Sequence, residues 1–457
     1  MAVFGSSLLG FLIAVAILVT IHELGHYLAA RWCGVKVVRF SVGFGPVLIR
    51  WIGRRSIFRG TEFAISAIPL GGYVRMLDTR DPEFSDIDSV QAQAAFNKKN
   101  LLTRSIIVVA GPLANFLLAA LLYSAALAIP DRDLSSLLAT PDADSPAAIA
   151  GIRGGERIVR VNDRPVAHWG DVRWELLVNL FDDQLKLDVE IGGIERSYAL
   201  SRGLTGSLGP DSVSARLGGW GLSFDQPAIV GTVKAGGPAE LAGLRERDAV
   251  LSVNGVAIRQ WNQLTRAIQQ SPGLPLIMVV ERSGSKRDVI VTPRSDSSGA
   301  RPVGRIDISA VNPTTLGEGW VVTRQRTLAD AVSAAVERTA DATALTVRVL
   351  WGMVTGEISL RQISGPLTMA EGAGVTLKQG AVSFALFLAI VSISIGVLNL
   401  LPVPMLDGGQ LLYHLFEAIK GAPLSERAEA LGQRVGIGFV TALTALALYN
   451  DFLRIIS

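Results

Sequence analysis

Two histidines and a glutamate near the start of the chain have the spacing of a metalloprotease site. His22 and His26 lie four residues apart, so a helix places both imidazoles on one face, where they can reach one zinc ion. Glu23 lies beside them and can act as a general base toward the water molecule that attacks a peptide bond. The sequence therefore predicts a zinc-dependent hydrolytic site that includes these three residues.

The segment that must carry this motif is apolar. Residues 4–21 hold no charge, and the run is long enough to enter a bilayer. Ionisable groups inside a membrane segment are costly, so they usually mark function. A role as interface markers for the two histidines would leave Glu23 unexplained. The segment also lacks the basic start of a signal peptide, so we expect it to be retained as a span.

The composition indicates a membrane protein. Of the 457 residues 49% are hydrophobic, and four apolar segments qualify as spans: 4–30, 105–129, 382–401 and 436–455. The net charge is only +3, and the cations concentrate beside the apolar spans, so we expect no nucleic-acid partner. Cys33 is the one cysteine, which excludes a disulfide within the chain.

The charges between the spans predict the orientation. Segment 31–104 carries twelve lysines and arginines, and the loop at 402–434 adds Lys420, Arg427 and Arg434. The positive-inside rule places both segments in the cytoplasm. Both termini and the large 130–380 region then lie on the outer side, and the end of the first span and the end of the third share the cytoplasmic face.

The outer region contains an internal repeat with an offset of 92 residues, as from Pro146 to Pro238 and from Trp169 to Trp261. Each copy continues into alternating apolar segments, which indicate strands. The repeated turns resemble those of a PDZ domain in its circularly permuted form. PDZ domains bind peptides by strand addition, whereas two small β-rich domains can also act as a spacer or a size filter. The sequence leaves both possibilities open.

Two further segments have a recognisable pattern. Residues 36–76 alternate apolar and basic positions and are rich in glycine, including Gly43 and Gly45, which favours a β-hairpin close to the membrane surface over an ordinary loop. Residues 325–356 have the pattern of an amphipathic helix that lies on the membrane or against the repeats.

Catalytic zinc commonly takes three protein ligands, so a third is needed. His168 falls in the outer repeat and is unsuitable, and His414 is a cytoplasmic candidate without further support. Asp407 is better placed, because Pro402 and Pro404 must break the helix after the third span, and such broken ends aim side chains into a cavity. An aspartate at this position can also be an ordinary helix cap. The H-E-x-x-H motif on the same side favours the metal role.

The chain as a whole resembles the site-2 proteases of the M50 type, most of all the bacterial branch that regulates the sigma-E stress response. The resemblance rests on the motif at 22–26, residues 399–409, the tandem repeat, 111–115 in the second span and 449–451 near the end. It implies an α-helical polytopic membrane protein with four transmembrane helices, two tandem circularly permuted PDZ domains of β-rich α+β type and a membrane-associated β-hairpin region. The expected parts are a first span with the motif (1–34), the cytoplasmic hairpin region (35–104), the second span (105–129), PDZ domains (130–224 and 225–315), a periplasmic helical region (316–380), the third span (381–410), a cytoplasmic loop (411–434) and the fourth span (435–457).

The resemblance also implies an activity, intramembrane zinc endoproteolysis. His22, His26 and Asp407 would bind Zn2+, and Glu23 would activate the water. Asn399 would contact the substrate backbone, and the hairpin region would hold the substrate as an added strand. The candidate substrate-contact residues are Asn399, Pro402, Pro404, Gly43 and Gly45.

The implied partners and location also follow from the resemblance. The substrates would be single-span anti-sigma-factor-like proteins that have already been trimmed, and signal-peptide remnants. The protein would lie in the lipid bilayer of the bacterial inner membrane, with PDZ domains and termini in the periplasm and the active site near the cytoplasmic face. The PDZ pair would keep uncut substrates away, and the sequence leaves open whether either copy also binds a peptide.

Two other functions compete with the protease. A catalytically idle PDZ scaffold would not need Glu23. A metal transporter would need ionisable residues spaced through several spans, whereas here they form one cluster.

Overall fold

The structure is a computed structural model, and it divides into two compact units. Unit 1 comprises Met1–Ile129 and Arg326–Ser457, and unit 2 comprises Pro130–Gln325. The described residues are 2–54, 56–84, 88–202, 218–297, 302–312, 315–317 and 319–456. Arg55 and parts of both expected PDZ domains, 203–217, 298–301 and 313–314, lie outside the described residues.

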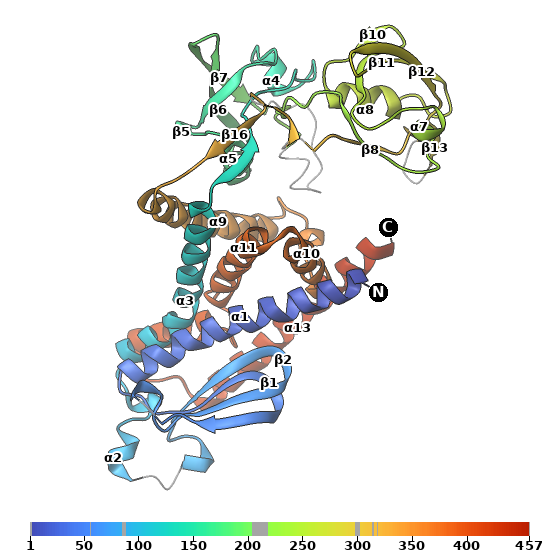
Figure 1. Ribbon diagram of the computed structural model, residues 1–457. Coiled ribbons are helices and arrows are strands. Elements are labelled where there is room, and N and C mark those ends of the chain that lie inside the picture. The colour runs from blue at the N-terminus through green and yellow to red at the C-terminus, as the bar shows by residue number, and fades with distance from the viewer. Residues whose placement is uncertain are drawn as a thin grey trace. The chain divides into compact units, whose positions relative to one another are not determined.

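In the described part of unit 1, four helices are long and apolar enough to cross a membrane (Figure 1). They are α1 (Ala2–Trp32), α3 (Leu101–Ala128), α11 (Ala381–Asn399) and α13 (Glu426–Ile456). Each expected span falls on one of them. The last helix begins well before the expected start at 435, because it continues through polar turns that an apolar pattern does not reveal.

Small residues let the membrane helices approach closely around α3. A Cβ on Gly25 of α1 would lie 2.2 Å from the carbonyl oxygen of Ala110 in α3. On its other side α3 packs against α11, where the hydroxyl of Ser392 donates to the carbonyl oxygen of Asn115 at 2.8 Å. Helix α3 is therefore held between α1 and α11. Small residues are common at such interfaces between membrane helices because they let the backbones come close.

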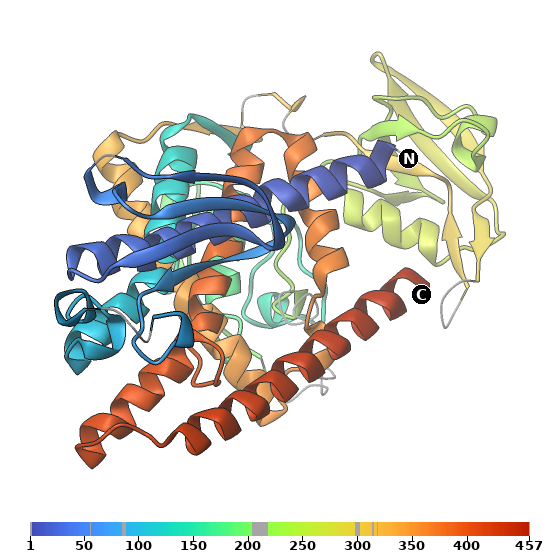
Figure 2. The same ribbon diagram turned by 90° about the horizontal axis from the view of Figure 1, so that it is seen from below.

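The expected hairpin region folds into a compact ribbon. Strands β1 (Val37–Ile52) and β2 (Glu62–Met76) pair with each other, and Phe40 pairs with both Phe63 and Val74, so the ribbon is four chain segments wide. Its inner aromatic residues pack around Tyr27 of α1. Figure 2 shows the ribbon lying across α1.

Gly43 and Gly45 cause the bend of β1. Both have positive φ values, 92° and 82°, which suit glycine. A Cβ on Gly43 would also lie 2.8 Å from the carbonyl oxygen of Ile68 in β2. These two glycines therefore shape the ribbon through their backbone.

Shorter elements complete unit 1. They are η1 (Ser56–Phe58), η2 (Pro82–Phe84), α2 (Ser89–Ala92), η3 (Phe96–Lys98), α9 (Leu328–Thr355), η5 (Leu360–Gln362), α10 (Pro366–Gln379) and α12 (Asp407–Lys420). The amphipathic helix expected over 325–356 corresponds to α9. The segment expected as a cytoplasmic loop, 411–434, contains the rest of α12 up to Lys420 and the start of α13 from Glu426. Within the part expected over 381–410, α11 ends at Asn399 and α12 begins at Asp407.

Helix α13 is fastened to α10 and η5 near its C-terminal end. The Asp451 carboxylate, which is buried, accepts hydrogen bonds from the backbone N–H groups of Gly365 at 3.0 Å and Leu367 at 2.9 Å. The neighbouring Asn450 amide donates to the carbonyl oxygen of Leu360 at 3.0 Å. The carboxylate thus satisfies the free N–H groups at the start of α10.

In unit 2 the sequence repeat is also a structural repeat. Both copies contain a four-stranded sheet, in the order β5-β4-β6-β7 and β10-β9-β11-β12. The first copy is formed by α4 (Pro146–Ile149), β4 (Arg157–Val161), β5 (Arg164–Pro165), α5 (Trp169–Val178), β6 (Gln184–Ile191) and β7 (Ile194–Ser201). The second is formed by β8 (Val230–Val233), α7 (Pro238–Leu241), β9 (Ala249–Val253), β10 (Val256–Ala257), α8 (Trp261–Gln269), β11 (Leu276–Arg282), β12 (Ser285–Val291), β13 (Arg294–Asp296), β14 (Val303–Arg305) and β15 (Ile308–Ala310).

The two copies also share the chemistry of one turn. Asn162 and Asn254 both have positive φ values, 46° and 48°. Their side-chain oxygens accept hydrogen bonds at 2.9 Å from the backbone N–H groups of Lys186 and Ile277, respectively. Asparagine tolerates the left-handed conformation, which explains its place in both turns.

The first and last strands of unit 2 pair with each other. Strand β3 (Asp131–Leu134) runs antiparallel to β16 (Val321–Arg324), with Asp131 opposite Arg324 and Leu134 opposite Val321. The two ends of unit 2 therefore lie side by side.

We expect Arg282→Leu to destabilise the second repeat by about 3 kcal/mol, because it leaves a buried carboxylate without its partner. Asp248 is 0% exposed, and its two carboxylate oxygens accept from the Arg282 guanidinium at 2.6 Å. The full chain is unfolded with urea in detergent, and proteolytic cleavage within 218–297 reports the unfolding of the second repeat. The shift of the unfolding curve measures the change in the free energy of unfolding. Arg305→Leu is the control, because its pair with Asp296 is more exposed and should be worth less than about 1 kcal/mol. Equal effects of both substitutions would contradict the prediction.

The pair of Arg282 and Asp248 also makes the stability of the second repeat depend on pH. Burial alone would raise the pKa of Asp248, but the Arg282 guanidinium and the Arg245 N–H outweigh it and lower the pKa from its ordinary value of 3.8. The stabilisation is therefore fully present above pH 3.8 and is lost as the pH falls through the lowered folded-state value. In Arg282→Leu the part of this acid-dependent contribution that comes from the guanidinium should be absent.

Candidate metal centre

The two histidines of the motif share one face of α1, as their spacing predicts. They are largely buried, with 8% of His22 and 9% of His26 exposed, and their Nε2 atoms lie 3.3 Å apart. The rings stand edge to face. Two ring nitrogens from successive turns of the helix therefore point at the same place.

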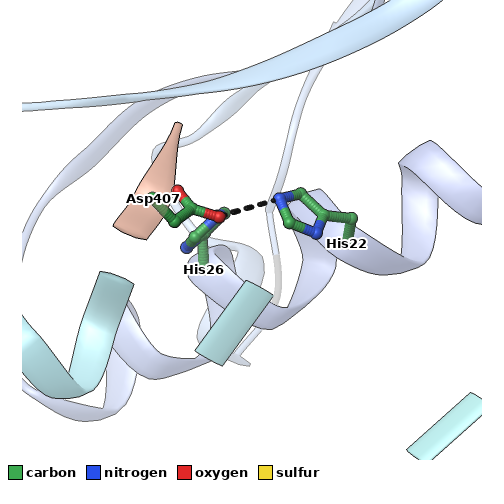
Figure 3. A group of neighbouring side chains, drawn as sticks. All are labelled: His22, His26 and Asp407. Atoms are coloured by element: carbon green, nitrogen blue, oxygen red, sulfur yellow. Dashed lines mark hydrogen bonds and ion pairs between the residues drawn. The ribbon is translucent and has the colours of Figure 1, made fainter. Parts of the chain in front are cut away.

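Asp407 comes to the same place from α12. Its Oδ2 lies 3.2 Å from Nε2 of His22 and 3.4 Å from Nε2 of His26, and Figure 3 shows the three side chains pointing toward one another. It is the first residue of α12, and Leu406 occupies the cap position without a side-chain capping bond. Asp407 therefore does not have the ordinary capping role that its position in the sequence allows.

The turn between α11 and α12 explains how Asp407 reaches the histidines. Pro402 and Pro404 lie between the two helices, where they stop α11 from continuing. A Cβ on Gly408 would lie 2.2 Å from the carbonyl oxygen of Leu401, and a Cβ on Gly409 would lie 2.3 Å from that of Val403. Only glycine at 408 and 409 lets the start of α12 pack so tightly on this turn.

The donor set fits a zinc ion. Zinc bonds of about 2.0–2.1 Å at the tetrahedral angle place ligand atoms roughly 3.3 Å apart, which matches the three separations. Oδ2 of Asp407 is buried and accepts no conventional hydrogen bond. Two imidazole nitrogens and one carboxylate oxygen are also ligands that zinc accepts. Among the described residues, this is the group of three whose ligand atoms all lie within 4.8 Å of one another.

The two other histidines lie elsewhere. His414 is on α12, and its Nδ1 lies 3.0 Å from the hydroxyl of Ser105 in α3. Next to this contact, Arg104 pairs with Glu417 at 2.5 Å. His414 therefore helps to dock α12 on α3. His168 belongs to unit 2, where it pairs with Asp133 at 3.1 Å.

The non-ligating nitrogens of the histidines contact α3. Nδ1 of His26 lies 2.9 Å from the carbonyl oxygen of Ile107, and Nδ1 of His22 lies 3.3 Å from the side-chain amide of Asn115. Gly111 lies between these two positions, and a Cβ there would come within 2.2 Å of Nε2 of His26. The sequence reasoning assigned no role to Ile107, Gly111 or Asn115. A polar residue in the middle of an apolar span is the sequence signal that could have pointed to Asn115.

A cavity of about 450 Å³ opens beside the three ligand atoms. It is lined by both histidines, Asp407, Glu23, Asn399, Gly72, Tyr73, Val74, Met76, Phe96, Ile107, Val108, Met405 and Gln410. Glu23 therefore shares the cavity with the ligand atoms, and Asn399 enters it from the end of α11. A Cβ on Gly72 would lie 3.2 Å from Cγ of Glu23, so the backbone of β2 runs directly past this carboxylate side chain.

Strand β2 borders this cavity. Gly72, Tyr73 and Val74 pair with β1 on one side, opposite Val42, Ser41 and Phe40, and in the described part of the chain no strand pairs with their other side. The open edge of a strand beside a cavity can receive an extended peptide.

The other predicted substrate contacts are not among the residues that line this cavity. Gly43 and Gly45 lie at the bend of β1, and Pro402 and Pro404 lie in the turn before α12. Met405, which sequence reasoning did not single out, lines the cavity and has a φ of 92°, an uncommon value for a residue with a side chain.

Comparison with known proteins gives consistent results. The family described as peptidase family M50 matches residues 10–443. A Neisseria meningitidis protein named as a zinc metalloprotease is 37% identical over 455 residues, covering 98% of this chain and 99% of the relative. The regulator of sigma E protease of Haemophilus influenzae and protease RseP of Yersinia pestis are each 34% identical over 456 residues, with the same coverage.

Proposed function

Because the chain belongs to peptidase family M50 and is therefore a membrane zinc metalloprotease, we propose that it cleaves single-span membrane proteins within or next to their membrane segment. The observation that carries this proposal is the convergence of His22, His26 and Asp407 beside Glu23, in a cavity between membrane helices and the edge of β2 that pairs with no strand among the described residues. A soluble peptidase would not need a membrane helix to carry this motif.

In the proposed site His22, His26 and Asp407 hold the zinc ion and Glu23 is the general base. Bound zinc supplies a Lewis acid that polarises the scissile carbonyl and makes water more acidic. Glu23 takes one proton from the water while the oxygen of the water forms a bond to the carbonyl carbon. Glu23 then gives that proton to the amide nitrogen as the C–N bond breaks, which releases an amine and a carboxylic acid.

A substrate helix must unwind before it can be cut, because its scissile carbonyl is engaged in the helical hydrogen bonds. The side of residues 72–74 that pairs with no strand among the described residues can offer replacement hydrogen bonds to an extended segment. Asn399 lines the same cavity and can bond the substrate backbone. In this proposal Gly43 and Gly45 shape the ribbon of β1 and β2 that holds the substrate strand. Pro402 and Pro404 shape the turn that brings Asp407 to the cavity.

The proposed substrates are trimmed anti-sigma-factor-like proteins and signal-peptide remnants. Support comes from relatives whose names describe them as regulators of sigma E. We place the protein in the bacterial inner membrane, with unit 2 and both termini in the periplasm. The metal centre then lies near the cytoplasmic face. The cations of 31–104 and 402–434 support this orientation.

The two repeats of unit 2 are proposed to be tandem circularly permuted PDZ domains. Their matching sheet orders and turns support two copies of one domain. Either as a size filter or as peptide binders, they would keep untrimmed substrates from the membrane site.

The test uses the purified full-length protein in detergent with a single-span substrate that lacks its outer domain. A second substrate retains that domain. We expect about one zinc per chain and a cut within the membrane segment, found by mass spectrometry, with slower cleavage of the untrimmed substrate. Zinc without cleavage of either substrate would contradict the proposed substrate class. A chain without zinc would contradict the proposed metal centre.

Removing the metal should abolish the activity reversibly. A chelator that strips the zinc should reduce cleavage to background, and adding Zn2+ in an amount equal to the protein should restore it, because the ligands return to the same cavity. Mg2+ is the control ion, since it prefers an all-oxygen, octahedral site. Cleavage that survives complete zinc removal would contradict a zinc mechanism.

A further inference from the structure

Asn115 is a polar residue in the middle of an apolar membrane helix. It lies on α3, it is 0% exposed, and its side-chain amide contacts Nδ1 of His22 at 3.3 Å. The Ser392 hydroxyl bonds to its backbone carbonyl, which fixes this point of α3 against α11. A buried amide in such surroundings is costly unless it forms hydrogen bonds. Its contact with His22 should therefore be a hydrogen bond.

The proton on His22 decides what that contact is. Nε2 of His22 faces Nε2 of His26 and Oδ2 of Asp407, so it can bind a metal ion only if it carries no proton. The neutral ring then keeps its proton on Nδ1, which becomes a donor. The partner of a donor must be an acceptor, and the amide of Asn115 provides one through its oxygen.

The oxygen and nitrogen of an asparagine amide are nearly identical in size and shape, so the side chain accepts this proton after a half-turn about its last bond. His26 already shows the same arrangement, because its Nδ1 faces the carbonyl oxygen of Ile107, which can only accept. Both imidazoles thus have an acceptor on α3 behind them and a free Nε2 in front.

We propose that Asn115 is a positioning residue for the metal centre: its Oδ1 accepts the Nδ1 proton of His22 and so aims an unprotonated Nε2 at the zinc site. This inference rests on the proposed metal ligands. Such outer partners fix the tautomer and the orientation of a ligating histidine, and their loss typically weakens metal binding 10- to 100-fold. A neutral amide does this without placing another charge inside the membrane.

The test measures zinc affinity by chelator competition for the full-length protein and three variants. We expect Asn115→Leu, of similar size, to bind zinc roughly 10- to 100-fold more weakly. Asn115→Asp keeps the acceptor and loses the donor, so its affinity should stay close to that of the unaltered protein. Asn450→Leu is the matched control, because it removes another buried asparagine of a membrane helix. Its amide bonds to Leu360 and not to a proposed zinc ligand, so zinc affinity should stay unchanged.

Several results would overturn the inference. Unchanged affinity in Asn115→Leu would show that His22 does not need the partner. An Asn115→Asp variant as weak as Asn115→Leu would show that the donor, not the acceptor, matters. If Asn115→Leu does not fold, nitrogen NMR of the unaltered zinc-bound protein decides, since a His22 ring without a proton on Nδ1 contradicts the assignment.

The same measurement separates this inference from the proposed function. If the unaltered protein binds no zinc, the metal centre itself is wrong. If the unaltered protein binds zinc and all variants bind it equally, the metal centre stands and only the role of Asn115 fails.

Discussion

Glu23→Gln is expected to lower the cleavage rate by about 10²- to 10⁴-fold while leaving the bound zinc unchanged, the range typical of a lost general acid–base group. Glutamine has the size of glutamate, but its amide cannot take a proton from water at neutral pH. The three candidate ligand atoms come from His22, His26 and Asp407, so the metal should remain. The measurement combines zinc content with the rate at which a trimmed single-span substrate is cut.

The control for this substitution is Glu371→Gln. Glu371 is an exposed residue of α10, so its loss of charge should change neither zinc content nor rate. If Glu23→Gln retained activity within about tenfold, Glu23 would not be the general base. If it lost zinc, Glu23 would belong to the ligand set.

Gly111→Ala is expected to abolish zinc binding through one methyl group. The added Cβ would lie 2.2 Å from Nε2 of His26 and 2.5 Å from Cε1, so the ring must leave its position. Helix α3 cannot simply move away from α1, because it also packs against α11, where the Ser392 hydroxyl donates to the carbonyl oxygen of Asn115. Overpacking of this kind typically costs about 1–3 kcal/mol of stability, but the loss of a metal ligand is the larger functional effect.

Gly438→Ala is the matched control for this second substitution. Gly438 lies in the membrane helix α13, where an added Cβ meets nothing within 4 Å. We expect it to keep normal zinc content, activity and thermal stability. An unaltered zinc content in Gly111→Ala would show that the α1–α3 contact adapts more readily than the structure indicates.

Sequence reasoning identified the parts of the site that follow from one helix or one apolar run. The spacing of His22 and His26 places them together on any helix, and long apolar runs reveal spans without tertiary information. Asp407 required a second inference, that the ends of two spans share one face of the membrane. Its distances to the histidines are a property of the folded chain.

The residues behind the histidines could not be found in this way. Ile107 acts through its backbone carbonyl, which no side-chain pattern reveals, and Gly111 matters because of what an added Cβ would touch. The folded-back ribbon of β1 and β2 likewise depends on pairing partners distant in sequence, for which local alternation gives no register.

The pairing of β3 with β16 makes unit 2 resemble an interchangeable cassette. The chain passes into unit 2 at Asp131 and leaves it at Arg324, and these residues are direct partners across one antiparallel ladder. A short turn that joins Leu134 to Val321 would close the same ladder as a simple hairpin, with neither end of unit 1 having to be rerouted. A different module could therefore be joined at this ladder, because its two strands carry both the entry into unit 2 and the exit from it.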